Sequence, residues 1–194
     1  MAIRSILQDD DPALRKKSRP VTEFNARLHQ LLDDLRDTLL EADGLGLAAP
    51  QVGVLRRVAL VVDAAEDENG DYDGDSADES VHDNERHGFR ENIIELINPE
   101  IICRGGEQIG QEGCLSVPGT YGVVERPMTV RVLAADRFGN PVEYKAEGLF
   151  ARAMCHEIDH LDGVIFTDVA RRLLTDEELE RLRAGEKIDF AKGI

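Results

Sequence analysis

The chain has 194 residues, 42% of them hydrophobic, which is enough material for the core of one domain. Its formal net charge of −16 excludes DNA as an expected partner, and it has no run of about 20 apolar residues that would predict a membrane-spanning helix. Because the three cysteines cannot all pair and the N-terminus lacks the apolar stretch of a signal peptide, we expect a cytoplasmic protein with reduced thiols.

The N-terminal part of the chain predicts a helix and a buried strand. Apolar residues recur at helical spacing within residues 22–42, and this pattern ends before Gly44. These residues are Phe24, Leu28, Leu31, Leu32, Leu35 and Leu39. Val58–Val62 is a continuous apolar run, which is typical of a buried strand.

Between these two elements lies Gly44–Gln51, with the sequence G-L-G-L-A-A-P-Q, which contains too much Gly, Ala and Pro for an ordinary helix or strand. Its composition suits a backbone that lies close against a ligand, with the Gln51 side-chain amide as a neutral donor. A plain turn is the alternative. A nucleotide-binding loop is disfavoured, because the segment lacks the Lys-Ser/Thr pair of a P-loop and the third Gly of a dinucleotide loop.

An acidic insertion follows at about residues 63–90. Eleven Asp or Glu residues and no Lys or Arg lie from Asp63 to Glu85, so we expect a solvated, mobile segment. Asp71, Asp73 and Asp75 alternate as in a calcium loop. Calcium binding is disfavoured, because the downstream Glu of an EF-hand is out of register and no flanking helix pair is evident.

The second half predicts strands followed by helices. The strand candidates are Ile93–Ile102, Gly122–Val124, Thr129–Ala134 and Val142–Ala146, with a hairpin turn at Phe138–Pro141 between the last two. A helix is expected from about Gly148 to Leu161, and Thr175 with Glu178 forms a capping box for a C-terminal helix at about 176–184. This order predicts one α+β domain over residues 1–194, with antiparallel β-strands packed around a central metal-binding helix.

The prediction of metal binding rests on His156-Glu157-Ile158-Asp159-His160. Two imidazoles four residues apart on a helix project from one face and can share a metal ion, while Glu157 reaches the water bound to that ion. Since the metal lowers the pKa of its water and the carboxylate moves protons, the motif indicates a hydrolase. Cys155 points about 100° away from His156, and we expect it to be a small buried residue, not a ligand.

A catalytic site of this kind needs a third protein ligand and one open position. Downstream of the motif, no acidic residue stands in a context that singles it out. The candidates there are Asp162, Asp168, Asp176, Glu177 and Glu178. Upstream, Cys114 lies at the expected edge of a strand or in a tight loop, where a thiolate can face a metal. A buried, inert thiol is the alternative.

The segments G-L-G-L-A-A-P-Q, E-G-C-L-S and H-E-I-D-H, in this order, resemble the three motifs of the peptide deformylases. The likeness extends through the connecting segments, apart from residues 64–92 and the C-terminal end. It implies removal of the N-formyl group from the initiator methionine of nascent proteins, with release of formate. It also implies that Cys114, His156 and His160 hold one divalent metal ion with water as the fourth ligand. Fe²⁺ is expected, and Zn²⁺, Ni²⁺ or Co²⁺ can replace it.

The resemblance assigns further roles around this ion. Glu157 would be the general acid and base, and Gln51 with the backbone N–H of Leu115 would stabilise the oxyanion. Leu45, Gly46, Leu149 and Ala153 would line the pocket for the methionine side chain, although Leu149 and Ala153 also fit as plain core residues. Glu112 and Arg126 would form an ion pair beside Cys114.

Two other functions are alternatives to deformylation. A zinc endopeptidase would use the same helix, but Cys114 and the Gly44–Gln51 segment argue against it. A non-catalytic metal- or peptide-binding homologue needs neither Glu157 nor Gln51. N-formylmethionyl nascent peptides are the expected partners. Ribosome contact through the C-terminal helix is expected to be weak, because residues 170–194 carry six basic and six acidic side chains.

Overall fold

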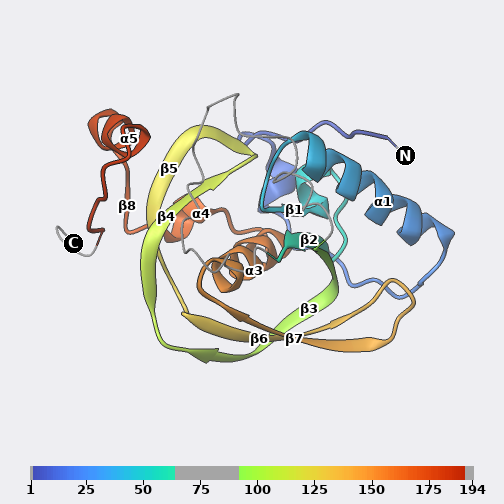
Figure 1. The fold of residues 1–194 in the computed structure, drawn as a ribbon. Coiled ribbons are helices and arrows are strands. Elements are labelled where there is room, and N and C mark those ends of the chain that lie inside the picture. The colour runs from blue at the N-terminus through green and yellow to red at the C-terminus, as the bar shows by residue number, and fades with distance from the viewer. Residues whose placement is uncertain (1, 64–91, 191–194) are drawn as a thin grey trace.

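The computed structural model describes residues 2–63 and 92–190. The fold is α+β: two antiparallel sheets enclose a central helix, α3 (Gly148–Leu161) (Figure 1). The first sheet has the order β1-β2-β3-β6-β7, and the second has the order β4-β5-β8. Apart from Asp63, the acidic insertion lies outside the described residues, and so does the calcium alternative.

The strands of the first sheet are β1 (Gly46–Ala48), β2 (Val58–Val62), β3 (Ile93–Gly105), β6 (Thr129–Ala135) and β7 (Pro141–Glu147). The second sheet contains β4 (Gln108–Cys114), β5 (Val117–Arg126) and β8 (Arg172–Leu173). The other helices are α1 (Ala26–Glu41), α4 (Phe166–Val169) and α5 (Asp176–Arg183), with 3-10 turns η1 (Pro12–Arg15) and η2 (Ala49–Val52).

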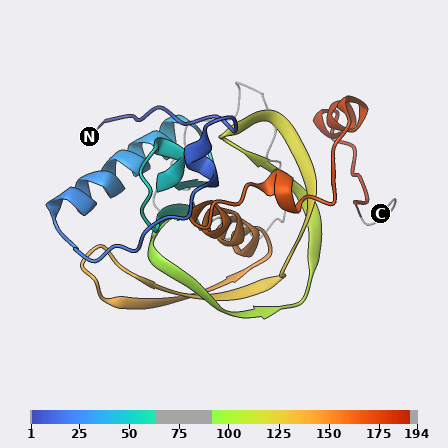
Figure 2. The ribbon, with the colours of Figure 1, turned by 180° about the vertical axis from the view of Figure 1, so that it is seen from behind.

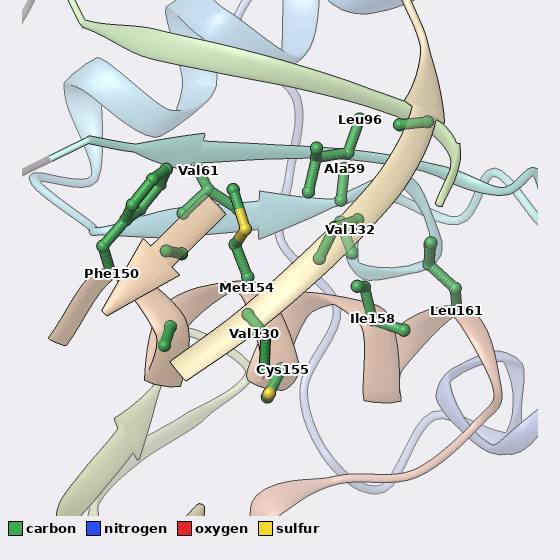
Figure 3. Packing of buried hydrophobic residues seen from close by; sticks show 14 residues of the cluster. Ala59, Val61, Leu96, Val130, Val132, Phe150, Met154, Cys155, Ile158 and Leu161 are labelled. Carbon is green, nitrogen blue, oxygen red and sulfur yellow. The ribbon is translucent and has the colours of Figure 1, made fainter. Parts of the chain in front are cut away.

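Helix α3 packs one apolar stripe against the first sheet. Phe150, Met154, Ile158 and Leu161 recur every three or four residues, and all four face the sheet (Figure 3). Their partners are Ala59 and Val61 of β2, Leu96 of β3, and Val130 and Val132 of β6. The two histidines of the motif lie on the other side of the helix, so the apolar stripe orients them away from the first sheet.

Several sequence predictions are confirmed with small changes of boundary. The predicted helix of residues 22–42 starts at Ala26, because the Asn25 side chain accepts hydrogen bonds from the backbone N–H groups of Arg27 and Leu28. Residues 58–62 form β2 and residues 148–161 form α3, as expected. The predicted strand Gly122–Val124 lies within the longer β5, in its second half.

The prediction for Gly44–Gln51 was partly wrong. Despite its composition, Gly46–Ala48 forms the edge strand β1, which pairs with Ala59–Val61 of β2, and residues 49–52 form η2. Strand β1 is only three residues long, so its glycine costs little strand stability. Tertiary pairing with an apolar strand overrides the weak local propensity of this segment.

The turn between β6 and β7 follows the sequence prediction. The Asp136 carboxylate accepts hydrogen bonds from the backbone N–H groups of Phe138 and Asn140, both at 2.8 Å. Gly139 has a φ of 89°, a left-handed conformation that favours glycine. The hairpin places β6 between β3 and β7, under the apolar stripe of α3.

The C-terminal helix α5 stands apart from the body of the fold, beside β5 and β8 (Figures 1 and 2). Thr175 and Glu178 form the predicted capping box, and the helix ends just before Gly185, which has a φ of 77°. None of its described residues is buried. Within residues 2–63 and 92–190, no helix is both long and apolar enough to cross a membrane.

Candidate metal centre

The structure brings together three side chains that sequence analysis predicted as metal ligands. Cys114 is the last residue of β4, and His156 and His160 lie one turn apart on α3. One potential ligand atom from each residue lies within 4.8 Å of the others, and the Cys114 Sγ is 3.2 Å from His160 Nε2. A thiolate and two imidazoles are a donor set that suits a divalent transition metal.

Glu112 of β4 orients the first of these histidines. The His156 Nδ1 donates a hydrogen bond to Glu112 Oε2 at 3.1 Å, which leaves the other ring nitrogen, Nε2, for a metal. The predicted ion pair with Arg126 is confirmed, with two hydrogen bonds of 2.9 and 3.0 Å. Burial opposes ionisation of Glu112, but hydrogen bonds with His156 and Arg126 prevail and lower its pKa to about 2. Asp159 contacts Arg126 and so supports the centre from outside.

Glu157 lies beside this group in a dry environment. The residue is 4% exposed, and its Oε2 is one of three buried polar side-chain atoms without a hydrogen-bond partner among the described residues. Burial raises the pKa of Glu157 to about 7. The His160 Nδ1 is another of the three. Buried polar atoms are normally paired, so this carboxylate oxygen keeps the capacity to accept a further hydrogen bond.

Gly46 of β1 lies directly against Glu157. A Cβ at this position would be 2.4 Å from Glu157 Oε1 and 2.6 Å from its Cγ. Glycine is therefore required here by close approach: any larger side chain would displace the carboxylate. The segment Gly44–Gln51 thus lies directly against the Glu157 carboxylate.

The amide of Gln51 has a defined orientation. Its Oε1 accepts a hydrogen bond of 2.8 Å from the backbone N–H of Ala48. Its Nε2 donates to Ser116 Oγ at 3.2 Å and approaches the Cys114 Sγ at 3.6 Å. Because the oxygen is occupied, the NH₂ end faces the thiol. Sequence analysis did not single out Ser116, which is fully buried and was visible only as part of the E-G-C-L-S motif.

The other predicted residues occupy more varied positions. Leu115 directly follows Cys114 in a two-residue turn between β4 and β5, so its N–H lies next to the thiol. Leu45 and Leu149 are half-buried, and Ala153 is half-buried against the core cluster under the first sheet. No contact in the structure tests their predicted role in a substrate pocket.

The remaining candidates lie outside the centre. Cys155 is buried in the core cluster, as predicted, and burial raises the pKa of its thiol to about 11. Among the downstream acids, Asp162 pairs with Arg57, Asp168 with Arg15, and Glu178 with Arg172. These acids are engaged in ion pairs with other parts of the fold.

The chain is similar to known proteins along most of its length. The family model described as polypeptide deformylase matches residues 3–175. A protein named peptide deformylase from Caldicellulosiruptor bescii is 49% identical over 191 residues, which make up 98% of this chain and 99% of that protein. A solved peptide deformylase from Legionella pneumophila has a TM-score of 0.70 and 38% identity, covering 96% of this chain and 100% of its own. A Thermotoga maritima peptide deformylase has a TM-score of 0.72 and 31% identity, covering 88% and 99%.

Proposed function

The chain belongs to the peptide deformylase family, whose members remove the N-formyl group from nascent peptides, and we propose which of its residues carry out this reaction. The observation that carries the assignment is the convergence of Cys114, His156 and His160 next to a buried carboxylate with an unpaired oxygen. Hydrolysis of an amide needs an activated water, a site for the oxyanion and an acid for the departing nitrogen. The centre has a residue for each task. Release of formate from a formylmethionyl peptide is the direct test.

Cys114, His156 and His160 would hold one divalent metal ion. When bound, this ion supplies Lewis-acid chemistry, lowering the pKa of a water and polarising the formyl carbonyl. We propose Fe²⁺ as the native ion, with Zn²⁺, Ni²⁺ or Co²⁺ able to replace it. Binding strength rises from Fe²⁺ toward Ni²⁺ and Zn²⁺ at sites of this kind, so metal analysis of protein purified without oxygen is the appropriate test.

Glu157 would move the protons of the reaction. Its carboxylate takes a proton from the attacking water and then gives it to the nitrogen that leaves the formyl carbon. Its burial and its unpaired oxygen support this role. The adjacent Gly46 fixes where the carboxylate can lie, since there is no room for a Cβ between them.

Gln51 and the backbone N–H of Leu115 would stabilise the negative charge that develops on the formyl oxygen. The Gln51 Nε2 has two hydrogens, and Ser116 takes only one of them. The second hydrogen donates to the Cys114 Sγ at 3.6 Å, a weak acceptor that the formyl oxygen would replace. Loss of one such donor typically costs about 3 kcal/mol of transition-state stabilisation.

We expect Gly46→Ala to lower kcat about a hundredfold, because a shift of about 1 Å in a catalytic group is enough for such a loss. The added Cβ would force Glu157 away, since it would start 2.4 Å from Oε1. Metal content should stay at the wild-type level. The control is Gly44→Ala, whose Cβ would have its nearest contacts with the side chains of Leu115 and Leu39, at 2.9 and 3.2 Å. A wild-type kcat in Gly46→Ala would show that the position of Glu157 is not limiting.

Leu45, Gly46, Leu149 and Ala153 are proposed to line the pocket for the methionine side chain. On this proposal, Ala153→Phe fills the pocket and raises KM for formylmethionyl peptides about tenfold or more, at unchanged metal content. The increase should be smaller for a formylalanyl peptide, whose side chain is short. An equal or absent change in KM for the two substrates would remove Ala153 from the pocket.

A nascent-chain substrate leads us to propose that the protein acts in the cytoplasm and visits the ribosome weakly through α5. Two basic side chains near this helix are neutralised, because Arg172 pairs with Glu178 and Arg181 with Glu186. Attraction to RNA should therefore be weak and should fall further with salt. Deletion of residues 176–194 should lower co-sedimentation with ribosomes at low ionic strength. Unchanged co-sedimentation would end this part of the proposal.

A further inference from the structure

Arg152 is a buried cation that the proposed reaction does not use. It lies on α3 one turn before His156 and is only 6% exposed. Its Nη1 donates to Glu112 Oε1 at 2.9 Å and to the Val124 carbonyl at 3.1 Å. A buried guanidinium needs such acceptors, because an unpaired charge is strongly disfavoured away from water.

The Glu112 carboxylate accepts two hydrogen bonds on each of its oxygens, from Arg126, Arg152 and His156. Its Oε1 accepts from Arg126 Nε and Arg152 Nη1, both at 2.9 Å. Its Oε2 accepts from Arg126 Nη2 at 3.0 Å and His156 Nδ1 at 3.1 Å. Helix α3 therefore contacts both oxygens of one carboxylate, through two side chains a single turn apart, while β5 contacts the same oxygens through Arg126.

Arg152 also joins the two elements that supply the metal ligands. Cys114 comes from β4, whereas His156 and His160 come from α3. Arg152 reaches from α3 to the Gln108 and Gly110 carbonyls of β4, at 3.4 and 3.5 Å. The fit is close: a Cβ on Gly110 would be 3.1 Å from Arg152 Nη2.

We propose that Arg152 is a positioning residue of the metal centre. It fixes the Glu112 carboxylate, and through it the ring of His156, and it sets the spacing between α3 and β4. Its effect on the metal is indirect, since it touches neither the ligand atoms nor the substrate. This inference rests on the proposed metal site of Cys114, His156 and His160. Loss of an outer partner of a ligand typically weakens metal binding about 10- to 100-fold.

Zn²⁺ affinity of the folded, metal-free protein, measured by competition with a chromogenic chelator, tests this role. Arg152→Met should bind Zn²⁺ about tenfold more weakly than the wild type. Arg152→Lys should lie between them, because an ammonium keeps the charge but cannot reproduce the planar set of donors. The matched control is Arg131→Met, since Arg131 is exposed on β6 and pairs only with Glu143 among the described ion pairs. Its Zn²⁺ affinity should be unchanged.

The thermal midpoint with and without Zn²⁺ separates positioning from simple stabilisation. A residue that only ties α3 to β4 lowers both midpoints equally and leaves the Zn²⁺-induced shift intact. That result, together with wild-type affinity in Arg152→Met, would overturn the proposal. If Arg152→Met does not fold, Gly110→Ala and Arg152→Lys take its place: weaker Zn²⁺ binding in both supports the proposal, and wild-type affinity in both overturns it.

Zn²⁺ binding by the wild type distinguishes a failure of the proposed metal site from a failure of the proposed role of Arg152. Failure of the wild type to bind one Zn²⁺ per chain, or equal binding in Cys114→Ala, would contradict the metal site itself. Stoichiometric binding that depends on Cys114 but not on Arg152 would contradict only the positioning role.

Discussion

Glu157→Gln should lower kcat/KM for formylmethionyl peptides about a thousandfold, or roughly 4 kcal/mol, because general acid-base catalysis typically contributes about 10²- to 10⁴-fold. The glutamine has the same shape, so it should keep its place against Gly46 and leave the metal ligands undisturbed. It cannot take a proton from water at neutral pH. Activity would fall while metal content and thermal stability remain near those of the wild type.

The control for this change is Glu143→Gln, which makes the same chemical substitution on β7, where Glu143 pairs with Arg131. Its kcat/KM should equal that of the wild type. Retention of more than a tenth of wild-type activity by Glu157→Gln, with one metal per chain, would mean that another group moves the protons.

Cys114→Ala should abolish both metal binding and activity. The thiol is one of three potential ligand atoms that lie within 4.8 Å of one another, and alanine offers no donor in its place. Metal affinity should fall more than a hundredfold, beyond the range of about 10- to 100-fold seen when an outer partner is lost. Elemental analysis after dialysis against a chelator measures this directly.

The other two cysteines provide matched controls for this prediction. Cys103 is exposed on β3, and Cys155 is buried in the core cluster and is not one of the three residues whose potential ligand atoms lie together. Cys103→Ala should have no effect. Cys155→Ala should lower stability slightly but keep the metal. If Cys114→Ala retained one tightly bound metal per chain, the metal site would have to be built from other residues.

The sequence was most informative where the spacing of the side chains matched the period of the element that they form. Helix α3 has the predicted limits because its apolar residues and its histidines both follow a helical period. The convergence of Cys114 with this helix could not be derived from spacing, since 41 residues separate it from His156 and it lies on a different element, β4. The resemblance to a family supplied that link.

The sequence was least informative where tertiary contacts override composition. Gly46 forms a strand because an apolar neighbour, β2, pairs with it, and no local pattern indicates this. The sequence also provided no indication of a role for Arg152, because a single arginine in a helix is usually exposed to solvent. Only its burial and its hydrogen bonds with Glu112 and Val124 lead us to propose a role for it beside the centre.

The most direct test of the assignment is formate release from a formylmethionyl tripeptide by protein purified without oxygen and loaded with Fe²⁺. We predict steady release of formate that depends on the metal and stops when a chelator removes it. No release from protein shown to carry one Fe²⁺ per chain on Cys114, His156 and His160 would contradict the account.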